Sequence, residues 1–94
     1  MSQVNTETAD KLLATYYYIG VLASPFALDC SVFGLTPEEA KALSKRFPTK
    51  TPLSVGINFG GSPFTIINAL SELGYRVISS SGETTVMWTM QREI

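Results

Sequence analysis

The pattern of apolar and polar positions is clearest from Ser62 to Met90, where it predicts a helix followed by two strands. The apolar residues of the first part share one helix face: Ile66, Ile67, Leu70 and Leu73. Ser62 and Pro63 suit the start of this helix, and Gly74 follows it, where a left-handed residue ends a helix without steric cost. Apolar and polar residues then alternate on both sides of Ser81–Gly82–Glu83, which predicts two strands joined by a tight turn.

The first half of the chain predicts two strands and a helix. Thr15–Ala23 is rich in aromatic and β-branched residues and is apolar on both faces, so we expect a strand that is covered or lies at an interface. A short second strand is expected over Phe26–Phe33. Thr36 and Glu39 have the spacing of a capping box at the start of a helix, which Pro48 ends.

The next segment is read as a strand over Leu53–Ile57, where apolar and polar residues alternate, followed by a flexible connection over Asn58–Gly61. The whole pattern predicts an α+β fold in which two helices pack on one face of a mainly antiparallel sheet. Residues 1–11 are polar and lack periodicity, so we expect a flexible N-terminal arm and a single domain over residues 12–94.

Composition adds an expectation about assembly and excludes some partners. In a chain of 94 residues, 45% apolar and only 16% charged residues leave apolar surface that a small domain cannot bury, which favours a homo-oligomer or an obligate complex. The net charge of −1 and the lack of a basic cluster argue against nucleic-acid binding. With no signal peptide and no long apolar run, we expect a cytoplasmic protein that does not bind membranes.

The residue types argue against catalysis. The chain contains no histidine, which removes the commonest general base and most zinc sites, so we expect no catalytic residues, metal or cofactor. Cys30 is expected to be a buried, inert thiol, and Glu38–Glu39 fits the acidic first turn of a helix. The glycine-rich stretch before Ser62 lacks a P-loop pattern; it is either a hinge or a helix N-terminus that can hold an anion.

The C-terminal segment resembles the GTP cyclohydrolase I feedback regulatory protein family. The resemblance is carried by Gly74–Ser79, the Ser-Gly turn after it, and Thr85–Trp88, which match the family's Gly-aromatic-Arg-Val-Leu-Ser strand, Thr-Gly turn and Thr-Leu-Val-Trp strand. It extends more weakly to Tyr16–Ile19 and Thr36–Glu39. Thr84 differs, because the family has a glutamine there.

The resemblance implies a non-catalytic regulatory protein that forms five-membered rings and binds GTP cyclohydrolase I. In the family, phenylalanine promotes an active complex with that enzyme and tetrahydrobiopterin an inhibited one. The family's ligand region corresponds here to the end of the first strand and the last turn: Leu22, Ala23, Ser24, Glu83 and Thr84. We further expect contacts between subunits at Tyr16, Tyr18, Gly82 and Trp88.

Two other classes of function remain open from the sequence. An ACT-like module that senses an amino acid and acts on an unrelated partner protein would have a similar α+β composition. An enzyme would need an acid–base group other than histidine.

Overall fold

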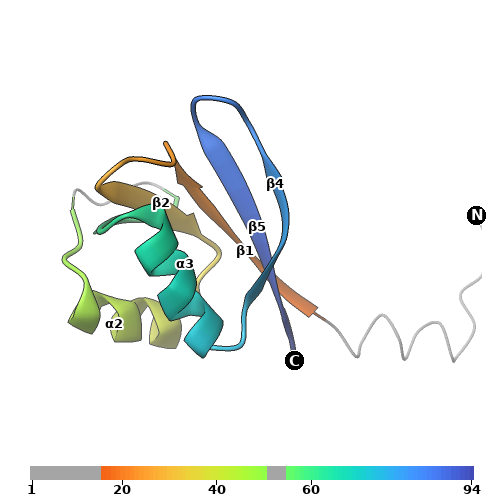
Figure 1. Ribbon diagram of the computed structural model, residues 1–94. Coiled ribbons are helices and arrows are strands. Elements are labelled where there is room, and N and C mark those ends of the chain that lie inside the picture. The colour runs from red at the N-terminus through yellow and green to blue at the C-terminus, as the bar shows by residue number, and fades with distance from the viewer. Residues whose placement is uncertain (1–15, 51–54) are drawn as a thin grey trace, which may run out of the picture.

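The computed structural model describes residues 16–50 and 55–94, which form a five-stranded sheet and two helices (Figure 1). In chain order the elements are β1 (Tyr16–Ala23), β2 (Asp29–Phe33), α2 (Pro37–Arg46), β3 (Ile57–Gly60), α3 (Pro63–Glu72), β4 (Arg76–Ser81) and β5 (Val86–Glu93). The strand order is β3-β2-β1-β5-β4, and every neighbouring pair is antiparallel. The predicted α+β class is confirmed, whereas the predicted N-terminal arm lies outside the described residues.

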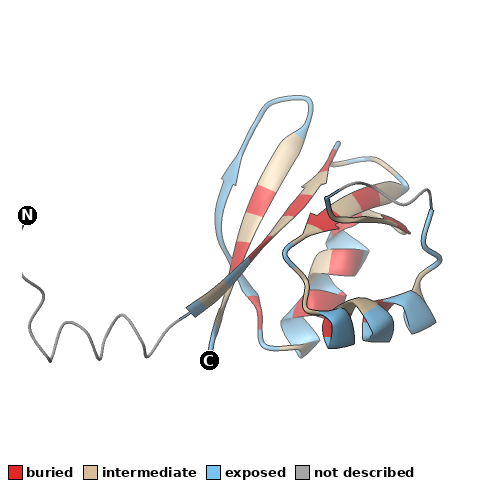
Figure 2. Cartoon of the chain, turned by 180° about the vertical axis from the view of Figure 1, so that it is seen from behind, coloured by how far each residue is buried: buried red, intermediate tan, exposed pale blue. Residues whose placement is uncertain are grey.

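The centre of the sheet is the long pair of β1 and β5, whose register runs from Tyr16↔Glu93 to Ala23↔Val86. Alternate residues of these strands are buried beneath the two helices, as Figure 2 shows by its red bands. Ile19, Val21 and Met90 are almost inaccessible on this face, whereas Tyr16 and Tyr18 on the opposite face are about half exposed. The helices therefore cover one face of the sheet, as the sequence pattern predicts.

Both helices begin and end where their capping residues predict. At the start of α2, the Glu39 N–H donates to Thr36 Oγ1 at 3.2 Å and the Thr36 N–H donates to Glu39 Oε1 at 3.0 Å, which completes the predicted capping box. At the start of α3, Ser62 Oγ accepts from the Thr65 N–H at 3.3 Å. Gly74 has a φ of +95°, which is the left-handed conformation expected after α3.

The prediction for the third strand is wrong in its position. Val55 and Gly56 lie outside any strand, and β3 instead comprises Ile57–Gly60, most of which was read as a flexible connection. Tertiary pairing decides this, because Phe59 is fully buried opposite Cys30 on β2. On the other edge of β3, the Gly60 N–H donates to the Pro48 carbonyl at 2.7 Å. Residues 53 and 54 lie outside the described part of the chain.

Two other strands begin later in the chain than the sequence pattern predicts, which starts them at Phe26 and at Tyr75. The second strand begins at Asp29, because the chain turns before it and the Ala27 N–H donates to the Ser24 carbonyl at 3.0 Å. Tyr75 precedes β4 and is buried in the core, while all residues of β4 are exposed. The register of β4 against β5 shifts between Val77 and Ser79, which marks a bulge at Ile78.

Candidate functional site

The predicted effector residues lie at one end of the sheet. The pairing of Ala23 with Val86 puts the end of β1 beside the start of β5, which the turn containing Glu83 and Thr84 precedes. Ser24, Glu83 and Thr84 are exposed, whereas Ala23 is buried. The fold thus brings to the same end of the molecule two segments that are about sixty residues apart in sequence.

Gly82 has a clear structural role in the turn of the β4–β5 hairpin. Its φ is +119°, and a Cβ at this position would lie 1.9 Å from the carbonyl oxygen of Thr85. No L side chain fits without moving the backbone. The shape of this turn, which carries Glu83 and Thr84, therefore depends on glycine, while contact of Gly82 with another subunit stays a prediction.

Large exposed apolar side chains gather at the same end of the molecule, a feature that the sequence analysis did not identify. Phe26 is 94% and Leu28 82% exposed in the connection between β1 and β2, and Phe64 at the start of α3 is 52% exposed. The signal in the sequence is the pair of apolar residues directly after Ser24–Pro25, in a connection where polar residues are usual. We call Phe26, Leu28 and Phe64 the apolar end of the molecule.

The four predicted interface residues occupy different environments. Tyr16 and Tyr18 lie on the sheet face that the helices leave open, where the Tyr18 hydroxyl accepts from Gln91 Nε2 at 3.1 Å. Trp88 lies on the covered face, is 9% exposed, and meets the Phe64 ring edge-on at 5.6 Å between centroids. Trp88 is thus a core residue of the single chain, and its contact with another subunit stays a prediction.

A buried polar cluster links α2 to the C-terminal end of β5, and no sequence pattern pointed to it. The carboxylate of Glu39 accepts from the Tyr75 hydroxyl at 2.9 and 3.0 Å and from Arg92 Nη1 at 2.6 Å. The Arg92 guanidinium also lies over the Tyr75 ring, 4.7 Å from its centroid. Glu39 is only 7% exposed, so its carboxylate forms a structural contact and is not accessible to a ligand.

The pKa values within the cluster follow from these contacts. Burial on its own would raise the pKa of Glu39, but hydrogen bonds from Thr36 and Tyr75 and the positive charge of Arg92 outweigh it and hold the pKa below its ordinary value of 4.5. Burial, followed by the hydrogen bond to Glu39, raises the pKa of the Tyr75 hydroxyl. At neutral pH the cluster therefore contains an ionised carboxylate beside a neutral phenol, which suits a structural contact.

Residues 16–50 and 55–94 contain one thiol, and its surroundings are apolar and buried. Cys30 is buried, and burial followed by the nearby charge of Asp29 raises the pKa of its thiol to about 12, which leaves it protonated and unreactive. Within the same residues, no group of three or more histidine, cysteine, aspartate or glutamate side chains is placed to hold a metal ion. Neither α2 nor α3 has the length and apolarity of a membrane-crossing helix.

Comparison with known proteins adds no relative. None of the models of protein families matches this chain, and a search of curated proteins found no sequence similar enough to count as one. A function for this chain is therefore inferred from its geometry and from the resemblance of its C-terminal segment to the GTP cyclohydrolase I feedback regulatory protein family.

Proposed function

We propose that this chain is a non-catalytic regulatory protein that binds GTP cyclohydrolase I in the cytoplasm and mediates feedback control by small effectors such as phenylalanine and tetrahydrobiopterin. It acts as a homo-oligomer, a pentameric ring by resemblance. The observation that carries the proposal is the apolar end of the molecule, which lies beside the residues predicted to contact the effector.

The apolar end has the character of a protein-binding surface. Phe26 and Leu28 expose almost all of their side-chain surface, and Phe64 about half. Exposing several large apolar side chains close together to water is energetically unfavourable, and such patches mark contact sites on soluble domains. Aromatic anchors of this kind supply much of the binding energy of protein interfaces.

Regulation follows if the effector is bound where the two proteins meet. Ser24, Glu83 and Thr84 are exposed at the same end of the sheet as the apolar end, so a ligand there would touch the regulatory chain and the enzyme together. Such a ligand changes the affinity between the proteins by its differential affinity for the free and bound states. This requires no catalytic group in the chain.

The exposed side chains on the open face of the sheet support the proposal of a homo-oligomer. Tyr16 and Tyr18 are 47% and 53% exposed on that face, and Leu22 and Met87 lie partly exposed on the same side. A second copy of the chain would bury this surface, and closed rings of identical subunits bury such faces repeatedly around an axis.

The test is a binding measurement with GTP cyclohydrolase I, with and without phenylalanine or tetrahydrobiopterin. We expect the two proteins to associate and either effector to strengthen their association. Sedimentation, or binding to one partner immobilised on a surface, measures the affinity. The double variant Phe26→Ser/Leu28→Ser should bind at least about tenfold more weakly, because truncating interface anchors costs 1–2 kcal/mol or more each. The matched control is Ile94→Ser, which removes an exposed apolar side chain at the opposite end of the sheet.

Absence of association under every effector condition would refute the partner. Equal binding by the double variant and the wild type would leave the partner in place but refute the role of the apolar end. The ACT-like alternative differs in its partner: it predicts that the chain binds an amino acid and acts on a protein unrelated to GTP cyclohydrolase I.

A further inference from the structure

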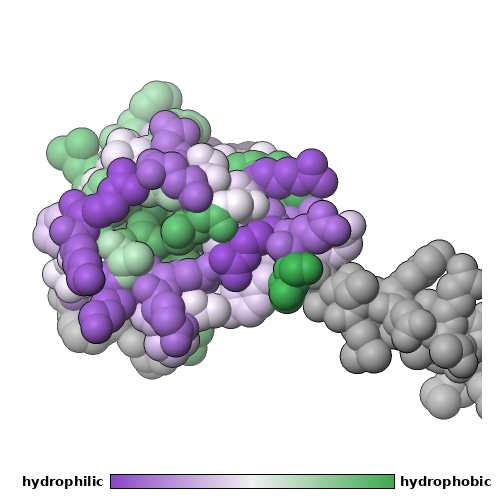
Figure 3. Space-filling model, turned by 90° about the horizontal axis from the view of Figure 1, so that it is seen from below, coloured by the Kyte–Doolittle hydropathy of each residue, from purple (hydrophilic) through white to green (hydrophobic). Residues whose placement is uncertain are grey.

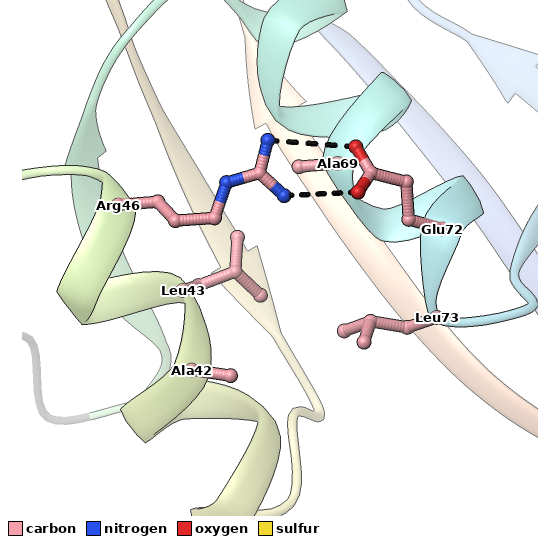
Figure 4. Close-up of a pocket in the computed structure, with 6 residues that line it drawn as sticks. All are labelled: Ala42, Leu43, Arg46, Ala69, Glu72 and Leu73. Atoms are coloured by element: carbon pink, nitrogen blue, oxygen red, sulfur yellow. Dashed lines mark hydrogen bonds and ion pairs between the residues drawn. The ribbon is translucent and has the colours of Figure 1, made fainter.

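A pocket lies between the two helices, α2 and α3. Its volume is 170 Å³, and six residues line it: Ala42, Leu43 and Arg46 from α2, with Ala69, Glu72 and Leu73 from α3 and its end (Figure 4). The hollow exists because each helix contributes an alanine, whose methyl group fills little of the space between the helices. None of these residues belongs to the effector region or to the apolar end.

The floor of the pocket is apolar. Leu43 and Ala69 are 2% and 3% exposed, and Leu73 packs partly buried against the core. Figure 3, which views the molecule from below, shows a hollow with a hydrophobic floor bordered by hydrophilic side chains. An apolar protein cavity of about 150 Å³ holds a benzene molecule, so the volume here suits an aliphatic side chain of similar size.

The rim carries one charge of each sign. Arg46 Nη1 lies 3.3 Å from Glu72 Oε1, and Arg46 Nη2 lies 3.4 Å from Glu72 Oε2. Tight pairs of this kind have distances of about 2.7–2.9 Å, so the two groups are in loose contact. Their side chains are 53% and 63% exposed, and an ion pair so accessible to water contributes little to stability. A ligand can therefore separate the two groups at small cost.

The guanidinium is held near the rim by a second contact. The Arg46 guanidinium carbon lies 5.4 Å from the centroid of the Phe47 ring, within the range of a cation–π contact. With Glu72 displaced, this contact would still keep the positive charge at the mouth of the pocket. The rim thus offers a carboxylate-binding fork and an ammonium-binding carboxylate directly above an apolar floor.

We propose that this pocket binds a free α-amino acid with a branched aliphatic side chain. Arg46 pairs with the ligand's carboxylate, Glu72 pairs with its ammonium group, and the side chain enters the space above Leu43 and Ala69. A ligand with a single charge would leave one rim group without a partner, and a ligand without an apolar side chain would leave the pocket unfilled. The site requires neither GTP cyclohydrolase I nor an assembled ring, so it stands independently of the proposed function.

The ligand test is an NMR titration of the full, isotope-labelled chain with L-leucine. We expect saturable shifts of the α2 and α3 amides with a Kd of roughly 1–10 mM, typical of a small ligand at an open site. Three analogues each lack one feature: 4-methylpentanoate lacks the ammonium, 3-methylbutylamine lacks the carboxylate, and L-alanine lacks the apolar side chain. The two singly charged analogues should bind roughly two- to fivefold more weakly than L-leucine, and L-alanine roughly tenfold more weakly.

The site test uses two variants with matched controls on the same helix. Ala42→Leu fills the pocket from an exposed position and should weaken L-leucine binding at least about tenfold, while Ser44→Leu, exposed and outside the pocket, should not. Arg46→Gln should weaken L-leucine binding roughly two- to fivefold, whereas Lys45→Gln should leave it unchanged. Melting temperatures of all four variants report whether each remains folded.

Three results would overturn the proposal. The first is the absence of saturable shifts at L-leucine concentrations well above the expected Kd. The second is equal binding by Ala42→Leu and Ser44→Leu, which would put the ligand elsewhere on the chain. The third is equal affinity for L-leucine and the singly charged analogues, which would exclude recognition by the Arg46–Glu72 pair. Because no cyclohydrolase is present, none of these results depends on the proposed function.

Discussion

At the scale of single residues, Glu39 connects two parts of the molecule. Its backbone and carboxylate complete the cap of α2. The same carboxylate accepts hydrogen bonds from Tyr75, directly before β4, and from Arg92, near the end of β5. A carboxylate that is only 7% exposed needs such partners, because an unpaired buried charge is strongly unfavourable. Glu39 therefore couples the start of a helix to the C-terminal strands.

This coupling predicts that stability depends on pH through Glu39. Its pKa in the folded chain is below 4.5, so its contribution is complete above the pKa of the unfolded chain and is lost as pH falls through the lower, folded value. Glu39→Gln should lower the free energy of unfolding by about 1–3 kcal/mol at pH 7 and reduce the loss of stability as the pH falls below the ordinary glutamate pKa of 4.5. Urea unfolding across this pH range measures both effects.

The control for this variant is Glu38→Gln, which removes a negative charge from an exposed position in the same helical turn. It should change the free energy of unfolding by no more than about 0.5 kcal/mol. An identical pH dependence in Glu39→Gln and the wild type would show that the cluster does not stabilise the fold.

At the scale of elements, Gly74 determines how α3 passes into β4. Its φ of +95° reverses the chain after Leu73, and the next residue, Tyr75, can then enter the core and donate to Glu39. A Cβ at Gly74 would lie 3.2 Å from Cδ of Arg92, so a larger residue would also press on the Arg92 side chain. One residue thus fixes both the end of the helix and the position of the buried cluster.

A Gly74→Val variant should lower the free energy of unfolding by about 1–2 kcal/mol or more, because a β-branched residue tolerates the left-handed conformation poorly. Gly74→Ala should have a smaller effect in the same direction. The control is Gly20→Ala in β1, where φ is ordinary and only the flexible end of Met87 must move. Thermal unfolding measures all three, and an unchanged melting temperature in Gly74→Val would contradict the role of this residue.

At the scale of the whole molecule, the two faces of the sheet differ. One face is covered by α2 and α3, while the other leaves Tyr16 and Tyr18 about half exposed. Edge strand β3 is partly covered by Thr49, which pairs with Phe59, whereas β4 is exposed along its length. Most of the large exposed apolar side chains therefore lie on the open face, along β4 and at the apolar end, while Val55 and Ile94 are exposed elsewhere.

Sedimentation of the full chain should give a mass several times that of the 10.2 kDa chain, in agreement with a ring. The double variant Tyr16→Ser/Tyr18→Ser should shift this equilibrium toward single chains, because it removes the aromatic surface of the open face. Phe26→Ser/Leu28→Ser should keep the assembled mass, since we assign that end to a different partner. A wild-type chain that sediments at 10.2 kDa at high concentration would exclude the ring.

Much of the fold was predictable from sequence because its signals are local. The capping box of Thr36 and Glu39, the Ser62–Pro63 start and the Gly74 stop each depend on residues within one turn of a helix end. The alternation around Trp88 likewise predicted a strand here, which is β5. The candidate site was less predictable, because Phe26 and Leu28 became notable only through their exposure.

The sequence by itself determined the α+β class and the limits of both helices, because hydrophobic periodicity and capping act over a few residues. Only the tertiary structure decided that Ile57–Gly60 forms a strand, since its pairing partners on β2 are distant in sequence and it also pairs with residues 48–50. It alone brought Glu39 to Tyr75 and Arg92, and Arg46 to Glu72. Contacts between residues 26 to 53 positions apart depend on how the elements pack, which no local pattern records.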